Sequence, residues 1–364
     1  MSASRVVVHI DFDYFFAQVE ERENPQIKHK PVVVCVYSGR SGDSGAVSTA
    51  NYIARKYGVK SGMPIAFAKK RLKDVDAVFL PVNHNLYDAV SERIMNIIRK
   101  YADKFEQVGV DEAFLEVTQR VNGNFEKASK LAFEIKTEIF SKEKTTCSIG
   151  IGPNKLVAKI AAGRQKPNGV TAVRPEKMQQ FLSPLPVREI VGVGRKTETA
   201  MQKAGIKTIG ELAAFNVSKL IDMFGKSLGI YFHNAALGID TSPVEQKNRV
   251  DSISRIITLK EDTRDINLLA EEIGKLVEDV ISSSVEQGFS FKTVSITAVM
   301  DDLTFNSRSK TFQNPTRSSK IAKETAIDLL IQLFKEETEH LIRRIGVKIS
   351  NLVERKGQKQ LTEF

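Results

Sequence analysis

Apolar and polar positions along the chain predict an α/β region followed by two segments of different character. Runs of β-branched and apolar residues at 6–10, 31–37 and 147–152 are typical of buried strands. Apolar residues spaced three and four apart predict helices over 86–101 and 125–140. Because strands and helices alternate here, we expect one small sheet covered by helices.

The pattern changes from about residue 171 onward. Short helices punctuated by glycines are expected up to 241, and the polar stretch 242–252 lacks periodicity, which indicates a linker. Beyond the linker the pattern predicts a compact βαββαβ unit. Its elements are strands at 253–259, 292–300, 308–312 and 345–353 and helices at 266–286 and 319–337.

Composition indicates a soluble, multidomain protein. The 364 residues can bury several cores, and no apolar stretch approaches the roughly 20 residues of a membrane span. The first residues run directly into a strand, so no secretory signal is expected. Cys35 and Cys147 lie in strand-like runs and are interpreted as buried thiols rather than as a disulfide. We therefore expect a cytoplasmic protein.

The net charge of +10 indicates a polyanionic partner. Acidic and basic residues balance from 242 to the end of the chain, yet the bases gather in two strips. The strip 303–323 contains no acid, and the strip 343–359 contains one. Such segregation fits a surface that follows phosphates, and a pair of solvated strand faces is the alternative. The strips include Arg308, Lys310, Arg343 and Arg344.

Four carboxylates at two places carry the main chemical signal. Asp11 and Asp13 follow the first strand, and Asp111 and Glu112 stand at the tip of a predicted hairpin over 105–117. Neighbouring strand residues point to opposite faces, so Asp111 and Glu112 converge only where the turn breaks the pleat. If the first strand neighbours this hairpin, Asp11 joins them, and three clustered acids need a cation.

Oxygen ligands restrict the choice of metal. The five histidines and two cysteines show no zinc spacing. An oxygen-only site favours Mg²⁺ or Mn²⁺, and two such ions about 3.5–4 Å apart perform phosphoryl transfer in polymerases and nucleases. Exposed turn acids are the alternative. Asp13, where the strand gives way to a helix, is interpreted as a cap or a surface acid.

Hydroxyl and cationic side chains near the same sheet could hold a triphosphate. Thr49, Tyr52 and Arg55 are spaced i, i+3, i+6 and are expected to share one helix face. Lys166 stands before a proline turn and can project a point charge. Taken singly, each of these residues is more often an ordinary surface residue than a functional one.

The glycine-rich segment contains one recognisable turn. Gly192 and Gly194, followed by Lys196, have the form of a helix-hairpin-helix turn. There the glycines allow close backbone approach and the next helix presents its N-terminal amides to a phosphate. An ordinary helical turn is the alternative. The order of a phosphate-binding loop, G-x-x-x-x-G-K-[ST], is absent from the sequence.

The last seven residues have the spacing Q-x-x-L-x-x-F. One helical turn would place Leu361 and Phe364 on one side, with Gln358 before them, as a two-pronged apolar plug for a sliding clamp. Random tails match so loose a pattern occasionally. The position at the very end of the chain favours the clamp-binding interpretation.

Five motifs occur in order along the chain, namely Asp11–Glu20, Ala50–Lys56, Val110–Leu115, Gly150–Lys159 and Lys166–Gly169. Together they resemble the motifs of Y-family translesion DNA polymerases, and most of all the archaeal enzymes of the DNA polymerase IV (DinB) type. The similarity covers residues 5–353.

The resemblance implies an α+β, right-hand architecture with a ferredoxin-like palm and a βαββαβ little finger. The expected domains are palm 1–22 and 82–170, fingers 23–81, helical thumb 171–241, linker 242–252, little finger 253–353 and clamp-binding tail 354–364.

The resemblance also implies roles for single residues. Asp11 and Asp111 would bind both metals, Glu112 the catalytic one, and the backbone carbonyl of Phe12 the nucleotide-bound ion. Phe16 falls at the steric-gate position, where an aromatic ring excludes a ribose 2′-hydroxyl, although core packing alone would also explain it. The residues expected around the incoming triphosphate are Tyr14, Thr49, Tyr52, Arg55 and Lys166.

The chain departs from the family pattern at Gly109, where serine is usual, and at Glu116, where aspartate is common. Neither departure removes a metal ligand. Small residues at Ala46, Ser48 and Gly62, where the fingers would cover the nascent base pair, are consistent with an open, low-fidelity site. No spare segment could house a proofreading exonuclease.

The function implied is template-directed synthesis of DNA past damaged templates, with two Mg²⁺ ions that Mn²⁺ could replace. Primer-template DNA, dNTPs and a sliding clamp are the expected partners of a monomer without a membrane. The rival enzyme is a nucleotidyl cyclase, which needs neither template nor helix-hairpin-helix turn. The rival from another class is a catalytically silent DNA-binding protein, whose function would survive the loss of Asp111.

Overall fold

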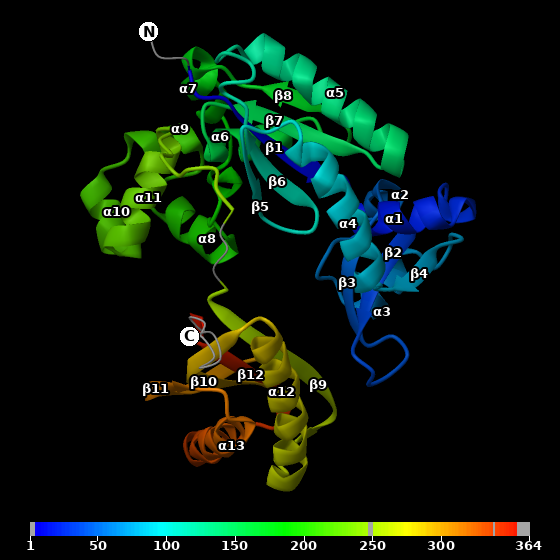
Figure 1. Cartoon of the computed structure of the whole chain (residues 1–364), viewed down its shortest axis with the longest axis vertical. Helices are drawn as coiled ribbons and strands as arrows, with labels where there is room; N and C mark the ends of the chain where they lie inside the picture. Colours follow the sequence, from blue (N-terminus) through cyan, green and yellow to red (C-terminus); the bar gives the residue numbers. More distant parts are fainter. Residues whose placement is uncertain (1–3, 247–249, 338, 355–364) are drawn as a thin grey trace, which may run out of the picture. The chain divides into compact units, whose positions relative to one another are not determined.

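The computed structural model describes residues 4–246, 250–337 and 339–354, and these form two compact units (Figure 1). The first unit comprises the described residues up to 36 together with 46–246. The second comprises 37–45 and the described residues from 250 onward. Each unit has cores of its own.

The first unit begins as the alternating α/β region that the sequence predicts. Up to residue 172 the elements are β1 (Val7–Phe12), α1 (Phe15–Glu23), the 3₁₀ turn η1 (Pro25–Ile27), β2 (Val32–Tyr37), β3 (Gly45–Ala50), α2 (Tyr52–Lys56), α3 (Ile65–Arg71), β4 (Val78–Pro81), α4 (His84–Arg99), β5 (Lys104–Gln107), β6 (Glu112–Glu116), α5 (Phe125–Glu143), β7 (Cys147–Gly152), α6 (Lys155–Ala162) and β8 (Val170–Ala172).

A five-stranded sheet with the order β5-β6-β1-β7-β8 forms the centre of this unit. Alternate residues of β1 face opposite sides. Val8 and Ile10 belong to the large core that α4 and α5 complete, whereas Val7 packs with Ala158 of α6. Helix α6 lies so close that a Cβ at Gly150 would stand 2.0 Å from the carbonyl oxygen of Ala158. Only glycine permits this approach.

A smaller sheet with the order β3-β2-β4 carries the segment expected to form the fingers. β2 contributes to two cores at once. Val32 and Val34 lie in the large core, whereas Val33 and Cys35 lie in a small core with Ile65 and its neighbours in 47–79. The buried thiols expected at Cys35 and Cys147 are confirmed.

Short helices follow, as the glycine pattern predicts. They are η2 (Pro175–Lys177), α7 (Met178–Leu182), η3 (Val187–Glu189), α8 (Arg195–Lys203), α9 (Ile209–Ala214), α10 (Val217–Phe224) and α11 (Lys226–Ala236). They share a core with α6. Thr208 and Glu211 form a capping box at α9, and Asn216 caps α10, which explains where these short helices begin.

The predicted linker 242–252 is docked over its first half. Val244 is completely buried against Val7 and Phe114. The side chain of Gln246 accepts a hydrogen bond from the N–H of Gln107 at 3.0 Å. One apolar residue in a polar stretch gives no periodic signal, so the sequence pattern does not reveal this anchor.

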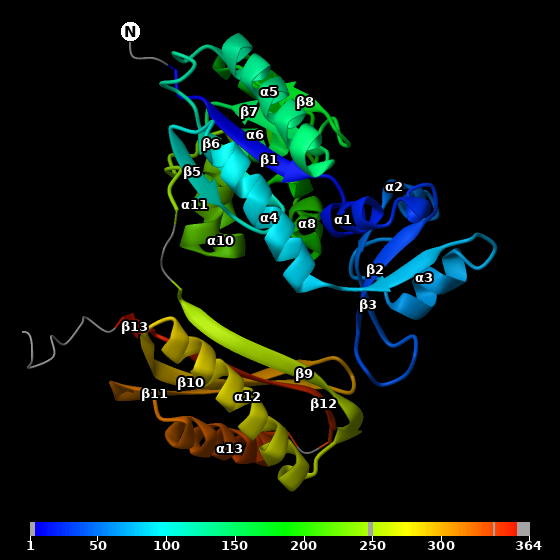
Figure 2. The ribbon, with the colours of Figure 1, turned by 45° about the vertical axis from the view of Figure 1, so that its right-hand side comes forward.

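The second unit contains the predicted βαββαβ order, which is confirmed. Its elements are β9 (Ser252–Thr263), α12 (Ile266–Glu286), β10 (Phe289–Met300), β11 (Phe305–Thr316), α13 (Ser319–Glu336), β12 (Ile342–Ser350) and β13 (Val353–Glu354). The sheet order is β11-β10-β12-β9, and α12 and α13 cover one of its faces (Figure 2).

Two details of the second unit differ from the predictions. The strand expected at 345–353 ends at Ser350, because Asn351 adopts a left-handed backbone conformation with φ of 53°. β13 then pairs with the start of β10.

No helix in the described parts of the chain is long and apolar enough to cross a membrane.

Candidate active site

The acidic residues of the first unit converge at one end of the five-stranded sheet. β1 runs antiparallel to β6, and Asp11 lies directly opposite Glu112 in this register. Asp111 immediately precedes β6, and its carbonyl oxygen accepts a hydrogen bond from the N–H of Phe12 at 2.9 Å. The first strand therefore neighbours the acidic hairpin, which is the arrangement that brings Asp11 to the acidic pair.

The surroundings shift the pKa of Asp111 and that of Glu112 in opposite directions. Burial and the negative charges of Asp11 and Glu112 raise the pKa of Asp111. Hydrogen bonds from His9 and Lys159 lower the pKa of Glu112 to about 2. Oxygen atoms of Asp11 and Glu112 and a ring nitrogen of His9 lie within 4.8 Å of one another. Clustered carboxylate oxygens repel one another, and a bound divalent cation removes this repulsion. These residues therefore fit a cation that prefers oxygen ligands.

Two side chains that the sequence interpretation missed contact Glu112. Nε2 of the fully buried His9 lies 3.2 Å from Oε2 of Glu112 and must donate to it, because a carboxylate only accepts. Burial lowers the pKa of His9. Lys159 of α6 forms an ion pair with the same oxygen. His9 stands two residues before Asp11 and so shares its strand face, a signal that could have identified it.

A cavity of about 280 Å³ adjoins the carboxylates, since Asp11 and Asp111 are part of its wall. The other lining residues are Phe12, Tyr14, Phe15, Phe16, Ser48, Thr49, Tyr52, Arg55, Ser61 and Lys166. The five side chains expected around the triphosphate are among them, and so is the expected gate residue Phe16. Acids, hydroxyl groups and cations therefore line one small space.

Aromatic and cationic side chains pack along one wall of this cavity. The ring of Tyr14 meets Tyr52 edge to face at 5.3 Å, and the guanidinium of Arg55 lies 4.9 Å from the centre of the Tyr52 ring. Nε of Arg55 donates to the carbonyl oxygen of Ala50 at 2.8 Å. The backbone of Tyr14 is left-handed, with φ of 37°, a strained conformation that clusters at functional sites.

The expectation that Thr49, Tyr52 and Arg55 share one helix face is wrong. Thr49 lies on β3, and Asn51 caps α2 by accepting a hydrogen bond from the N–H of Ala54 at 2.9 Å. With Asn51 as its cap, the helix starts at Tyr52, three residues later than a helical Thr49 requires. The three side chains nevertheless reach the same cavity, from a strand and from a helix.

Phe16 is held by aromatic neighbours behind the cavity. Its ring stacks on Tyr87 at 4.2 Å with an interplanar angle of 16°, and it meets His84 edge to face at 6.2 Å. The hydroxyl of Tyr87 donates to Glu20 at 2.5 Å. The ring is thus fixed from one side while its other edge lines the cavity.

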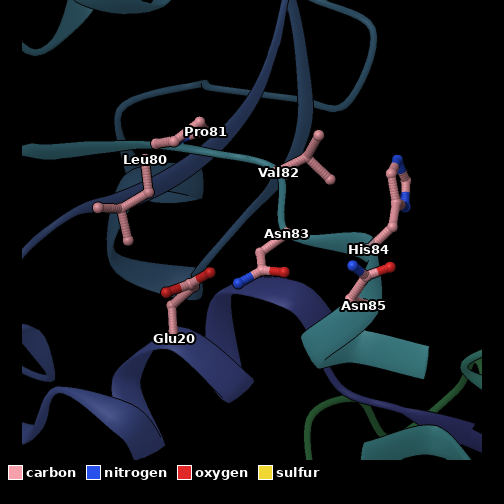
Figure 3. Close-up of a pocket in the computed structure, with 7 residues that line it drawn as sticks. All are labelled: Glu20, Leu80, Pro81, Val82, Asn83, His84 and Asn85. Atoms are coloured by element: carbon pink, nitrogen blue, oxygen red, sulfur yellow. The ribbon is translucent and has the colours of Figure 1, made fainter. Parts of the chain in front are cut away.

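A second hollow, of about 610 Å³, lies beside this aromatic group (Figure 3). It is lined by Glu20 and by residues 80–85, and in Figure 3 the carboxylate of Glu20 lies between Leu80 and Asn83. Among the described residues in its lining, one is acidic and none is Lys or Arg. This hollow therefore lacks the charge that a triphosphate requires, unlike the smaller cavity.

The interpretation of Asp13 as a cap or a surface acid is wrong. Its side chain is completely buried and accepts hydrogen bonds from Ser148, Thr146 and the backbone of Asn168. These partners lie 133–155 residues away along the chain, so local pattern gives no sign of them.

The helix-hairpin-helix residues lie at the start of α8. Gly192 has φ of 88°, a conformation that favours glycine, and Gly194 is the N-cap of α8. Nothing lies within 4 Å of a Cβ built on Gly194, and Lys196 is exposed. The backbone amides at this helix start are therefore open to solvent.

The basic residues of the second unit do not share one face. Arg343 and Arg344 are adjacent on β12, but the register shifts between Ile342 and Arg344, so strand alternation does not fix the direction of Arg343. Arg343 is engaged by Asp262 through two hydrogen bonds of 2.7 and 3.2 Å. Arg344 is exposed on the face that the helices leave uncovered, opposite Thr258 of β9.

Arg308 and Lys310 lie on the side of the sheet that the helices cover. Arg308 pairs with Ile296 of the core in the β10–β11 register, and Lys310 with Val294. Arg308 forms an ion pair with Glu336 of α13, whereas Lys310 is exposed. The predicted clamp-binding residues Gln358, Leu361 and Phe364 lie outside the described residues.

Comparison with protein families matches three regions of the chain. The model of the impB/mucB/samB family matches residues 10–163, its C-terminal domain matches 250–363, and the thumb domain of DNA polymerase iota matches 188–240.

Individual relatives extend over nearly the whole chain. The DNA polymerase IV of Nitrosopumilus maritimus is 47% identical over 362 residues, 99% of either chain. The DNA polymerase IV 1 of Methanosarcina mazei is 45% identical, again over 99% of each. Among solved structures, the Y-family chimera Dbh-Dpo4(243-245)-Dbh has a TM-score of 0.90 at 41% identity, covering 96% of this chain and 99% of that one.

The fold is that of a DNA polymerase, and the polymerases of this fold depend on divalent metal ions. The chain belongs to the impB/mucB/samB family, the Y-family polymerases, and specifically to the DNA polymerase IV (DinB) group. It is a DNA-directed DNA polymerase of translesion synthesis. The rival interpretations, a nucleotidyl cyclase and a silent DNA-binding protein, are therefore set aside.

Proposed function

We propose that the chain extends a DNA primer by two-metal nucleotidyl transfer in the cavity between Asp11, Asp111 and Arg55. The observation that carries this proposal is that acids, hydroxyls and cations together line one cavity of about 280 Å³, in which Lys166 pairs with Asp11. Asp11 and Asp111 would hold both ions, Glu112 the catalytic one, and the carbonyl of Phe12 the ion bound with the nucleotide. Bound Mg²⁺ lowers the pKa of the primer 3′-hydroxyl and neutralises phosphate charge, and Mn²⁺ offers the same oxygen-ligand chemistry.

The side chains of the cavity bind and orient the incoming dNTP. Arg55 and Lys166 supply positive charge to phosphate oxygens, and Arg55 is held in place by its contacts with Tyr52 and Ala50. The hydroxyls of Thr49 and Tyr52 donate hydrogen bonds to the same group, and that of Tyr14 does so after leaving Glu21, to which it donates at 3.2 Å here. In such a site positioning and charge neutralisation carry the reaction, without a side-chain nucleophile.

Removal of divalent cations tests the metal assignment. Protein treated with EDTA is expected to bind primer-template DNA but to add no nucleotide, because the acids alone repel the triphosphate. Addition of Mg²⁺ or Mn²⁺ should restore extension on undamaged and abasic-site templates, measured as primer length on a denaturing gel. Extension in the metal-free buffer, or extension that needs no template, would contradict the proposal.

Contacts with the DNA backbone are proposed for the start of α8 and for the little finger. The open amides at Gly192 and Gly194, with Lys196, are suited to a backbone phosphate. In the little finger, the exposed Lys310 and Arg344 are suited to the same role, each on its own face of the sheet. Such contacts hold duplex DNA without reading its sequence, as a polymerase requires.

The C-terminal peptide is proposed to bind a sliding clamp, and the enzyme is proposed to act as a cytoplasmic monomer. Deletion of residues 358–364 is expected to abolish stimulation of synthesis by the clamp and to leave basal synthesis unchanged, because the tail lies beyond the last strand. Primer extension with and without clamp measures both quantities. Replacement of Lys359 by alanine, inside the tail but outside the Q-x-x-L-x-x-F positions, is the matched control. An equal loss of basal and stimulated synthesis would count against the role of the tail.

A further inference from the structure

Asp13 is an acid of the first motif that the proposed reaction does not use. It stands two residues after Asp11, yet its side chain is completely buried, whereas the residues on either side of it, Phe12 and Tyr14, line the cavity. A buried carboxylate is costly unless hydrogen bonds compensate for the lost water. The partners of Asp13 therefore indicate what it does.

Three donors from two other segments satisfy this carboxylate. The hydroxyl of Ser148 donates to Oδ1 at 2.7 Å, and the hydroxyl of Thr146 donates to Oδ2 at 2.9 Å. Ser148 lies on β7, and Thr146 immediately precedes that strand. The third donor is the backbone N–H of Asn168, which lies 2.8 Å from Oδ2. Asp13 thus ties the end of β1 to the turn that contains Lys166.

The turn over 166–169 is fixed from both of its sides. Nζ of Lys136 on α5 donates to the carbonyl oxygen of Asn168, and the N–H of Ile149 donates to that of Gly169 at 3.0 Å. Asp13 holds the opposite, N–H side of Asn168. Asn168 has φ of 58°, so the turn reverses sharply at the residue that Asp13 binds.

Lys166 projects from this turn into the active site. Its ammonium pairs with the carboxylate of Asp11, and its side chain lines the nucleotide cavity. A lysine side chain is long and flexible, so where its charge resides depends on where its backbone is anchored. A backbone shift of the turn would move the ammonium away from the phosphate oxygens it is meant to meet.

We propose that Asp13 is a positioning residue for Lys166: its buried carboxylate anchors the Lys166–Gly169 turn so that the ammonium stands in the nucleotide cavity. This inference rests on the proposed function, in which Lys166 binds the triphosphate. Asp13 touches neither nucleotide nor metal and acts on the reaction only through the turn. A purely structural role, joining β1 to β7 through Thr146 and Ser148, is the competing account.

A double-mutant cycle separates the two accounts. The measured quantity is the dissociation constant of dNTP for the enzyme on a dideoxy-terminated primer, so that no chemistry occurs. Asp13→Ala and Lys166→Ala are each expected to raise this constant on the order of tenfold. Because both act on the same contact, Asp13→Ala should add less than about twofold in the Lys166→Ala background.

Conservative variants sharpen the cycle. Asp13→Asn is expected to stay within about threefold of wild type, because the amide oxygen still accepts from Asn168 while the Ser148 hydroxyl turns to accept from the amide nitrogen. Thr146→Val removes a donor to the same Asp13 oxygen but spares the turn, so it should change the constant less than about twofold. Where Asp13→Ala fails to fold, Asp13→Ser takes its place in the cycle.

The outcomes distinguish this inference from the proposed function. Additive effects of Asp13→Ala and Lys166→Ala on the dNTP dissociation constant would overturn the positioning role while leaving the proposed function intact. The same conclusion would follow if Thr146→Val raised this constant as much as Asp13→Ala does. If Lys166→Ala binds dNTP as tightly as wild type, the nucleotide role of Lys166 fails, and the positioning role fails with it.

Discussion

Replacement of Asp111 by alanine is expected to slow nucleotide addition on the order of 10³-fold and to leave DNA affinity within about twofold of wild type. Asp111 is one of two acids in the wall of the nucleotide cavity, and burial together with the negative charges of Asp11 and Glu112 raises its pKa. Without it the ions lose a shared ligand, whereas the DNA-binding surfaces proposed for α8 and the second unit are untouched. Single-turnover primer extension and fluorescence anisotropy measure the two quantities separately.

Glu112→Gln provides the same test without a change of shape. The amide keeps a partner for His9 but removes the charge that Lys159 and a metal ion share. Glu116→Gln is the matched control, because it lies on the same strand and pairs with Arg5. The control should extend primers at the wild-type rate. Retention of more than a tenth of the wild-type rate by Asp111→Ala would contradict the metal assignment.

Replacement of Phe16 by alanine is expected to raise incorporation of ribonucleotides relative to deoxyribonucleotides on the order of 10²-fold. The Phe16 ring is clamped against Tyr87 and His84, so it cannot rotate away from a 2′-hydroxyl in the cavity. Removing the ring opens the space that the hydroxyl needs. The measurement is the ratio of kcat/KM for matched ribo- and deoxyribonucleoside triphosphates.

Tyr87→Phe is the control for sugar selection. It deletes the hydroxyl that donates to Glu20 but preserves the stacked pair of rings. Its selectivity should equal that of wild type if the Phe16 ring alone excludes the hydroxyl. Unchanged selectivity in Phe16→Ala would refute the gate assignment and leave core packing as the role of this residue.

Much of the fold follows from the sequence because the strong signals are local. Helix α12, for example, is predicted with both ends correct, since Asp265 caps it by accepting from the N–H groups of Asn267 and Leu268. The proximity of Asp11 to Glu112 could be predicted only on the assumption that the first strand neighbours the hairpin. Which strands are neighbours is a property of the sheet, and no local pattern encodes it.

The features that the sequence did not reveal depend on contacts between distant segments. The burial of Asp13 requires Asn168, 155 residues away. The opposite faces of Lys310 and Arg344 follow from the pairing of β11, β10 and β12, which no local pattern encodes. Thr49 was misplaced because helical spacing was extended through the cap at Asn51. Side-chain chemistry at a cap outweighs spacing over so short a helix.

The shared strand β2 has a mechanical consequence for nucleotide selection. Since Val32 and Val34 are embedded in one core and Val33 and Cys35 in the other, the fingers cannot swing as a lid without unpacking one of them. Enzymes that reject mismatches by induced closure depend on such a swing. Because shared packing resists such a swing, we expect this polymerase to select nucleotides without a closing motion of the fingers.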